Sequence, residues 1–259
     1  MPSKTFTEKA LDIYHVVIPP KIDREIKRAL SNSQPDFPRS VSLPSGYGMG
    51  MTERVVELLV ARLTYQPGMK VLDVGHANII NAHARVLKSL PKPLDITGVD
   101  IVAAGDHIRS LYTNSVVANI AKTDFYDGTF DLIWCISALE HFGMDNSIYT
   151  HDFELDQNMD RAALTEMMRI LRVGGTVYIS VPFGKFEDHG WLRNYDADRW
   201  RTLLSVPGSR AHVDELYFRF TDEGGWQTAT PGELINTGYS DHQNSGASGL
   251  AVALIRKLK

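Results

Sequence analysis

Acidic residues and a glycine follow the ends of three short apolar runs, where they can contact a nucleoside. The first run leads through Asp73 to Gly75, whose missing side chain lets the backbone pass close to a ligand. Asp100 closes the second run, and its carboxylate can accept hydrogen bonds from both hydroxyls of a ribose. Asp124 follows the third run and can accept from an adenine amino group, with Phe125 near the ring. The structural alternatives are a strand-to-helix turn, a helix cap and a solvated turn, respectively.

Histidines follow the two later apolar runs. Glu140 or His141 can remove a proton from a substrate, and so can His189, since histidine has an unperturbed pKa close to neutral pH. Asp188 can orient a histidine. The alternatives are packing or a cofactor contact for His141, and a divalent ion such as Mg²⁺ held by both histidines and Asp188. Their spacing matches no tight metal motif, so no metal ligand is assigned.

Apolar strands alternate with helical segments along most of the chain. This order predicts an α/β fold with a Rossmann-like, mostly parallel sheet that is flanked by helices and has right-handed crossovers. Two later strands, 213–221 and 249–255, are expected to form an antiparallel C-terminal edge. The other expected strands are 70–74, 94–99, 115–120, 129–136 and 176–181, and the expected helices are 52–63, 79–90, 104–112, 156–171 and 196–204.

Residues 1–50 are expected to form an N-terminal helical and loop extension. Within it, residues 21–30 predict a short helix, and residues 31–50 are rich in Ser, Pro and Gly, which is typical of a loop that can act as a lid. No linker divides the rest. Residues 51–259 are therefore expected to form one domain, with acceptor-binding insertions at about 138–156 and about 183–212.

The order of these motifs resembles the class I S-adenosylmethionine-dependent methyltransferases. The resemblance covers roughly residues 50–185 and rests on residues 71–75, 98–100, Asp124, 130–141 and the helix before Gly174-Gly175. Of the family's Gly-x-Gly-x-Gly turn only Gly75 is present, with Ala77 and Ile79 at the other positions. The resemblance implies S-adenosylmethionine as the cofactor, held by Asp73, Gly75, His76, Asn78, Asp100, Ile101, Asp124, Phe125 and Ser137.

The C-terminal third, above all residues 181–191, is similar to methyltransferases of glycan and glycosylated natural-product pathways. This implies methylation of a hydroxyl on a nucleotide-activated or glycosidically attached deoxysugar, with His141, His189 and Asp188 activating the acceptor. The alternatives are an N- or O-methyltransferase for another small metabolite, and a catalytically degenerate binding protein, which the missing glycines suggest. The poor glycine turn and Gly174-Gly175 argue against a nicotinamide-dependent oxidoreductase.

Composition limits the partners. The 259 residues carry a net charge of −4, which argues against nucleic acid as a partner. The expected partner is a sugar-containing small molecule, and a homodimer is left open. With one cysteine, a charged N-terminus and no apolar run of about 20 residues, the chain is expected to be cytoplasmic, without membrane association.

Overall fold

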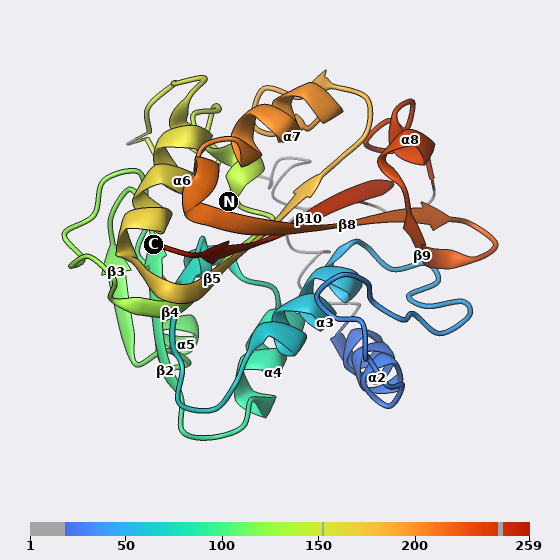
Figure 1. Ribbon diagram of the computed structural model, residues 1–259, viewed down its shortest axis with the longest axis horizontal. Coiled ribbons are helices and arrows are strands. Elements are labelled where there is room, and N and C mark those ends of the chain that lie inside the picture. The colour runs from blue at the N-terminus through green and yellow to red at the C-terminus, as the bar shows by residue number, and fades with distance from the viewer. Residues whose placement is uncertain (1–18, 152, 243–245) are drawn as a thin grey trace, which may run out of the picture.

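An eight-stranded sheet forms the centre of the protein (Figure 1). The computed structural model describes residues 19–151, 153–242 and 246–259. The strands of the sheet are β1 (Lys70–Val74), β2 (Asp95–Asp100), β3 (Asn114–Val117), β4 (Phe130–Ile136), β5 (Leu171–Pro182), β8 (Ala211–Thr221), β9 (Gly225–Ala229) and β10 (Gly249–Lys257). Their order is β3-β2-β1-β4-β5-β10-β8-β9; β1 to β5 run parallel, and β10, β8 and β9 pair antiparallel. This confirms the predicted Rossmann-like sheet with an antiparallel C-terminal edge.

The central strands are buried on both faces. In β10, for example, Leu250 and Val252 belong to one hydrophobic cluster, whereas Ala251 and Ala253 belong to the cluster on the other side. Successive residues of a strand point to opposite faces, so a strand covered on both sides must be apolar throughout. This explains why the sequence shows short continuous apolar runs here.

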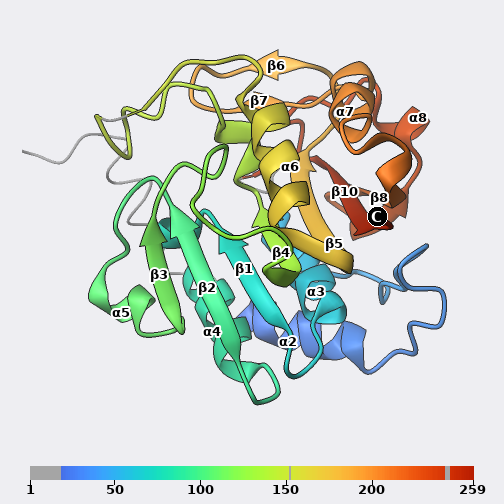
Figure 2. The same cartoon turned by 60° about the vertical axis from the view of Figure 1, so that its left-hand side comes forward.

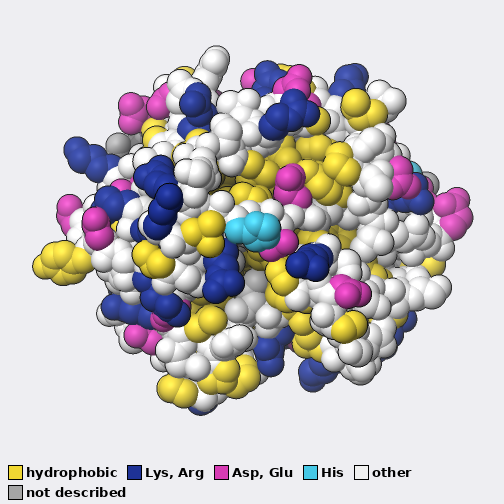
Figure 3. Space-filling view, in the orientation of Figure 1, with side chains coloured by type: hydrophobic (Ala, Val, Ile, Leu, Met, Phe, Trp, Pro, Cys, Tyr) yellow, Lys and Arg dark blue, Asp and Glu magenta, His cyan; other side chains and the backbone are white. Residues whose placement is uncertain are grey.

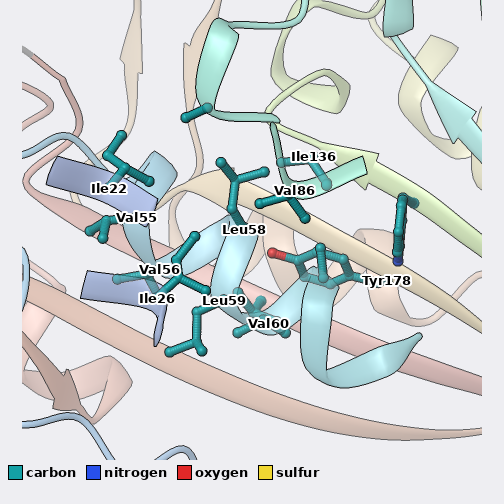
Figure 4. Packing of buried hydrophobic residues seen from close by; sticks show 14 of the residues in the cluster. Ile22, Ile26, Val55, Val56, Leu58, Leu59, Val60, Val86, Ile136 and Tyr178 are labelled. Atoms are coloured by element: carbon teal, nitrogen blue, oxygen red, sulfur yellow. The ribbon is translucent and has the colours of Figure 1, made fainter. Parts of the chain in front are cut away.

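Helices cover the two faces of the sheet (Figure 1). Residues of α2 (Pro19–Leu30), α3 (Arg54–Thr64), α4 (Asn81–Ser89) and α5 (Asp106–Arg109) join the first cluster, and residues of α6 (Met159–Ile170), α7 (Ala197–Leu204) and α8 (Pro231–Leu234) join the second. Figure 4 shows α3 at the centre of the first cluster, between Ile22 and Ile26 of α2 and Tyr178 of the sheet. Packing of α3 in this cluster thus holds the first residues of the helix, including Arg54, in a fixed position against the sheet.

Several predicted boundaries differ from the structure, and two of them concern the family's glycine motifs. Helix α4 begins at Asn81, and Ile79 before it has extended backbone rather than the predicted helical conformation. Gly174 lies inside β5, with a φ of 80°, and the pairing of β4 with β5 changes register between Phe130 and Leu132. The double glycine therefore forms an irregularity within β5 instead of separating a helix from a strand.

The N-terminal extension is partly confirmed. The predicted helix at residues 21–30 is α2, and residues 31–50 form neither helix nor strand; residues 1–18 lie outside the described part of the chain. Tyr47 is fully buried, donates its hydroxyl hydrogen to the Val55 carbonyl and accepts a hydrogen bond from the Trp226 amide through its own carbonyl. The loop is thereby attached to α3 and β9. None of its residues lines the cavity described below, so the structure gives the predicted lid no support.

The carboxyl ends of β1 to β4 meet at one edge of the sheet (Figure 2). Above this edge lie the connection from β4 to α6 and a hairpin that the sequence did not predict, formed by β6 (Glu187–Asp188) and β7 (Arg193–Asn194). Because β1 lies between β2 and β4, this edge contains the topological switch point, where open α/β sheets bind ligands.

The face with α7 is covered less completely. Figure 3 shows apolar side chains between α7 and β8, where Leu204, Val213 and Tyr217 are only partly buried.

No helix among the described residues is both long and apolar enough to cross a membrane.

Candidate active site

A cavity of about 500 Å³ opens at the carboxyl edge of the sheet, which is the size of a small-molecule site. Its walls come from the ends of β1 to β4, the 3-10 turn η1 (His76–Asn78), the start of α4 and the segment after β4. The polar residues in these walls include Arg54, Asn78, Asp100, Asn119, Ser137, His141, Asn146, Tyr149 and Glu154. The cavity lies at the place where the sequence predicted the cofactor.

Gly75 forms the turn after β1. Its φ is 81°, and its amide donates a hydrogen bond to the Val99 carbonyl at 2.9 Å. A Cβ at this position would lie 2.9 Å from the Cβ of Ala138, which is closer than real Cβ atoms approach. Glycine is therefore required both by the backbone conformation and by the close approach of the turn after β4. Asn78, the last residue of η1, and Ile79, which follows it, both line the cavity.

Asp100 lines the cavity at the end of β2. One carboxylate oxygen accepts the Ala77 amide at 2.9 Å and the other accepts the Val102 amide at 3.2 Å. Burial raises the pKa of Asp100, and the backbone hydrogen bonds counteract this shift. These amides hold the carboxylate beside the glycine turn, next to Ile101, which also lines the cavity. Lone pairs of the same oxygens are available to two ribose hydroxyls.

Asp73 and His76 lie behind the cavity wall rather than in it. Asp73 is buried and accepts a hydrogen bond from the Tyr112 hydroxyl at 2.7 Å, while His83 Nε2 lies 3.1 Å from the same oxygen. The His76 ring is also buried, with Nε2 2.7 Å from the Ser115 hydroxyl, and a Cβ on Gly98 would overlap this ring. We conclude that Asp73 supports the turn and that His76 packs under it, so neither makes the predicted contact from the cavity wall.

The third strand places different residues in the cavity from those predicted. β3 ends at Val117, and the four residues Val117–Ile120 line the cavity. Asp124 is exposed and lies outside the lining, while the Phe125 ring packs edge-on against Phe130 at 5.1 Å. The predicted strand ran to Ile120, so the expected contact was placed too far along the chain. Asn119, two residues beyond the true strand end, is the polar residue that the sequence reasoning missed.

Ser137 lines the cavity at the end of β4, as expected for a cofactor contact. It has a φ of 42°, a conformation that is costly for a residue with a side chain. Its hydroxyl donates to Glu57 Oε1 at 2.6 Å, and the other oxygen of Glu57 lies 2.7 Å from the guanidinium of Arg54. These contacts hold Ser137 in place and direct Arg54, a second residue that the sequence reasoning missed, to the cavity. The sequence signal that could have identified Arg54 is its position as a cationic residue at the start of the helix before β1.

His141 lies in the cavity wall at the end of the 3-10 turn η2 (Leu139–His141), and His83 of α4 also lines the cavity. Its Nδ1 lies 2.8 Å from the Trp191 carbonyl. A carbonyl can only accept, so Nδ1 carries the hydrogen and Nε2 keeps a free lone pair in the neutral ring. Burial lowers the pKa of His141 to about 4, which keeps the ring neutral at physiological pH. The Trp191 ring packs against it at 5.0 Å.

His189 and Asp188 are on the β6–β7 hairpin and do not line this cavity. His189 Nε2 lies 3.1 Å from Glu187 Oε2, and 37% of its side chain is exposed. Asp188 accepts the Gly190 amide and lines a separate polar cavity between α6 and α7. Within the described ranges no three His, Cys, Asp or Glu side chains are grouped to hold a metal ion, so the Mg²⁺ alternative is not supported.

Residues 72–179 match the family model described as a methyltransferase domain. Among solved structures, the chain is similar to a 1,6-didemethyltoxoflavin-N1-methyltransferase from Burkholderia thailandensis, crystallised with 1,6-didemethyltoxoflavin and S-adenosylhomocysteine. That likeness has a TM-score of 0.53 at 14% identity, and covers 100% of this chain and 93% of the other. The family model matches less than half of the chain, and the likeness in structure shows a Rossmann-like methyltransferase fold.

Two further likenesses show how widely this fold is used. One is the [4+2]-cyclase SpnF, with a TM-score of 0.50 at 13% identity, covering 99% of this chain and 98% of the other. The other is a complex from Haloferax volcanii that contains the Trm112 methyltransferase activator, with a TM-score of 0.51 at 15% identity, covering 83% of this chain and 95% of the other. At such identities the likeness concerns the fold, so the acceptor must be argued from the cavity.

Proposed function

We propose that the protein transfers the methyl group of S-adenosylmethionine to a hydroxyl of a small, sugar-containing acceptor. The observation that carries this proposal is the neutral imidazole of His141 in the wall of the cavity that also contains Asp100 and Gly75. A base and a ribose-binding carboxylate thus share one space. S-adenosylmethionine, when bound, supplies an activated methyl group.

The residues of the cavity fit this cofactor. Gly75 lines the cavity without a side chain, so a ligand can approach the backbone of the turn. The fixed carboxylate of Asp100 suits the ribose hydroxyls, and the apolar side chains of Ile101 and Ile120 suit the faces of an adenine ring. Arg54 supplies a positive charge for the carboxylate of the methionine part.

His141 is the proposed general base. Its Nδ1 hydrogen is fixed on the Trp191 carbonyl, so the proton of the acceptor hydroxyl goes to Nε2 as the bond from oxygen to the methyl carbon forms. The acceptor oxygen must lie in line with the methyl group, and the rigid wall around His141 holds the acceptor in position.

The acceptor side of the cavity supports a sugar. Asn146, Tyr149 and Glu154 provide donors and acceptors in the segment that encloses His141, and Phe153 adds an aromatic surface. Hydroxyl-rich rings need both kinds of hydrogen-bonding group, and their C–H faces pack on aromatic rings. An N-methyltransferase for another small metabolite would use the same base, so the acceptor must be identified by experiment.

A degenerate binding protein is the second candidate. Ile79 stands where the family's turn has its third glycine, and its side chain lines the cavity. A bulky residue here narrows the space for the methionine part of the cofactor. Calorimetry with S-adenosylmethionine and S-adenosylhomocysteine separates the two candidates: we expect micromolar binding, and absence of binding at millimolar ligand would favour the degenerate protein.

Turnover is tested by mass spectrometry. Nucleotide sugars, glycosides and non-sugar metabolites are incubated with S-adenosylmethionine, with and without Mg²⁺ and chelator, and a gain of one methyl group is sought. We expect it on a sugar hydroxyl in the wild-type protein and not in His141→Ala. Methylation of a nitrogen instead would overturn the sugar assignment while leaving the cofactor assignment intact.

A further inference from the structure

Arg54 is surrounded by three buried carboxyl groups beside the cavity. Glu53 caps the start of α3, Glu57 lies in its first turn, and Glu140 belongs to η2. All three act on the charge of Arg54 and raise its pKa, which keeps the guanidinium positive. One cation therefore serves three acids in a region from which water is largely excluded, and the three cannot all ionise at low cost.

Glu57 is the acid that is already balanced. Its Oε2 is paired with Arg54 at 2.7 Å, and its Oε1 accepts hydrogen bonds from the hydroxyls of Ser137 at 2.6 Å and Ser180 at 2.8 Å. Every one of these contacts comes from a donor, so both oxygens of Glu57 have partners. Glu53 is held less fully, since its Oε2 accepts the Ala247 amide at 3.0 Å.

Glu140 is the acid without a dedicated partner. Its side chain is buried, its Oε2 has no hydrogen-bond partner, and its Oε1 lies 3.9 Å from His141 Nε2, beyond hydrogen-bond distance. Burial raises its pKa to about 8, although the charge of Arg54 acts in the opposite direction. Burial similarly raises the pKa of Glu53 to about 7. Glu140 thus changes its charge just above neutral pH, and it does so beside Arg54.

The other titratable groups around Glu140 do not change their charge in this range. Burial raises the pKa values of Cys135 in β4 and of Tyr178 in β5 well above normal. It also raises those of Tyr149 and Tyr195, on which Glu140 acts. His141 moves the other way, to a pKa of about 4. Only Glu53 and Glu140 remain as groups of this cluster that exchange a proton between about pH 6 and about pH 9.

We propose that Glu140 takes up one proton from solvent when an anionic group of the ligand binds to Arg54. This inference rests on the proposed function, in which the anion is the carboxylate of S-adenosylmethionine. The arriving carboxylate takes a share of the one cation and adds a negative charge close to Glu140. An ionised Glu140 is then no longer balanced by the positive charge of Arg54. A proton from solvent therefore binds to its carboxylate and forms a new O–H bond. No other bond changes.

The coupling predicts how cofactor affinity depends on pH. Below the pKa of Glu140 in the free protein, about 8, the proton is already in place and affinity is constant. Above it, each binding event takes up one proton from solvent, so affinity falls by up to about tenfold per pH unit. A ligand without the carboxylate escapes this loss. Glu140 therefore makes the cavity selective for anionic ligands at neutral pH and less so at alkaline pH.

The experiment uses S-adenosylhomocysteine and 5′-methylthioadenosine, which shares the nucleoside but has neither the carboxylate nor the amino group. Calorimetry at pH 8.5 in phosphate and in Tris, whose ionisation enthalpies differ, gives the number of protons taken up on binding. We expect between about 0.5 and about 0.8 proton for S-adenosylhomocysteine and none for 5′-methylthioadenosine, in line with proton linkage. Equal uptake for both ligands would overturn the inference.

Variants assign the proton to a residue. Glu140→Gln should bind S-adenosylhomocysteine at pH 7 within about threefold of wild type, but without proton uptake at pH 8.5, whereas the matched Glu53→Gln should retain it. Retained uptake in Glu140→Gln would overturn the assignment. If that variant does not fold, the affinities of the two ligands for the wild-type protein are measured between pH 6.5 and pH 9.5. The same dependence of affinity on pH for both ligands would overturn the proposal. Failure of S-adenosylhomocysteine to bind at any pH would instead overturn the proposed function.

Discussion

The segment after β4 and the hairpin after β5 carry similar side chains, yet they occupy different places. Each has a histidine, an acidic neighbour and nearby aromatic rings, and each follows a strand end. His141 lines the main cavity, whereas His189 does not. The sheet order explains the difference: β4 pairs with β1 at the switch point, and β5 lies one strand farther out. A strand spacing of about 4.8 Å is enough to move a side chain out of a small cavity.

The two segments are nevertheless connected. The hairpin supplies the Trp191 carbonyl that fixes the His141 tautomer and the ring that packs beside it. The segment after β4 thus provides the proposed catalytic group, and the hairpin provides its support. The difference teaches that similar residue composition at two strand ends does not imply a shared site, because the position of the strand in the sheet decides what its end can reach.

The largest expected difference between the two segments is in turnover. His141→Ala should lower kcat by about 100- to about 10,000-fold, the range for loss of a general base, while His189→Ala should stay within about threefold of wild type. Both are measured by methyl transfer to the acceptor found in the mass-spectrometric screen, with S-adenosylhomocysteine affinity as the control. Equal losses in the two variants would show that the hairpin contributes a catalytic group after all.

The next largest expected effect is on cofactor affinity, and it contrasts Asp100 at the end of β2 with Asp124 in the loop after β3. Asp100→Ala removes the proposed acceptor of two ribose hydroxyls and should weaken S-adenosylhomocysteine binding by about 10- to about 100-fold, since hydrogen bonds to a charged group contribute about 1.5–3 kcal/mol. Asp124→Ala, at an exposed position outside the cavity, is the matched control and should change the dissociation constant by less than about twofold. Calorimetry gives both values. A large loss in Asp124→Ala would mean that the loop after β3 moves toward the ligand.

The third prediction compares the unfolding free energy that is lost when either of two glycines with nearly the same backbone conformation is replaced by alanine. Gly75 has a φ of 81° and Gly190, in the hairpin, has a φ of 82°, but only at Gly75 would a Cβ meet a neighbour, Ala138. Gly190→Ala should cost about 1–2 kcal/mol of unfolding free energy, the cost of the left-handed conformation alone. Gly75→Ala should cost more and should also weaken S-adenosylhomocysteine binding. Urea denaturation measures the loss of unfolding free energy in both variants, and calorimetry measures binding. An equal loss in the two variants would show that the turn after β4 moves to make room for the added methyl group.

The smallest expected effect concerns the support that the hairpin gives to His141. His141 must be neutral to accept a proton, and its pKa of about 4 places the acid limb of kcat/KM near that pH. Trp191→Ala leaves the carbonyl in place but exposes the ring of His141 to water, so the limb should move toward the ordinary value of about 6.5 while kcat at pH 8 falls about threefold. The pH–rate profiles of both proteins test this. An unmoved limb would mean that burial by Trp191 does not control the His141 pKa.

Much of the site could be predicted where a residue directly follows a correctly bounded strand. Gly75 and Asp100 come within one residue of the ends of β1 and β2, and both line the cavity as expected. Asp124 lies outside the cavity lining because β3 ends at Val117, three residues before the predicted end. His76 lies outside it for another reason: neighbouring residues of a tight turn point in different directions, and only the packing against Gly98 shows which way the ring lies.

The sequence by itself determined the order of strands and helices from α3 to β5, the glycine turn and the acid of the second strand, because these depend on local apolar patterns and on backbone conformations that few residues adopt. Only the tertiary structure decided that His141 and not His189 lines the cavity, that Arg54 joins the site, and that Glu140 lies buried beside it without a partner. Helix α3, η2 and the hairpin are far apart in the sequence and meet only when the sheet is assembled. Charge, burial and hydrogen bonding between them are properties of that assembly, which no local pattern encodes.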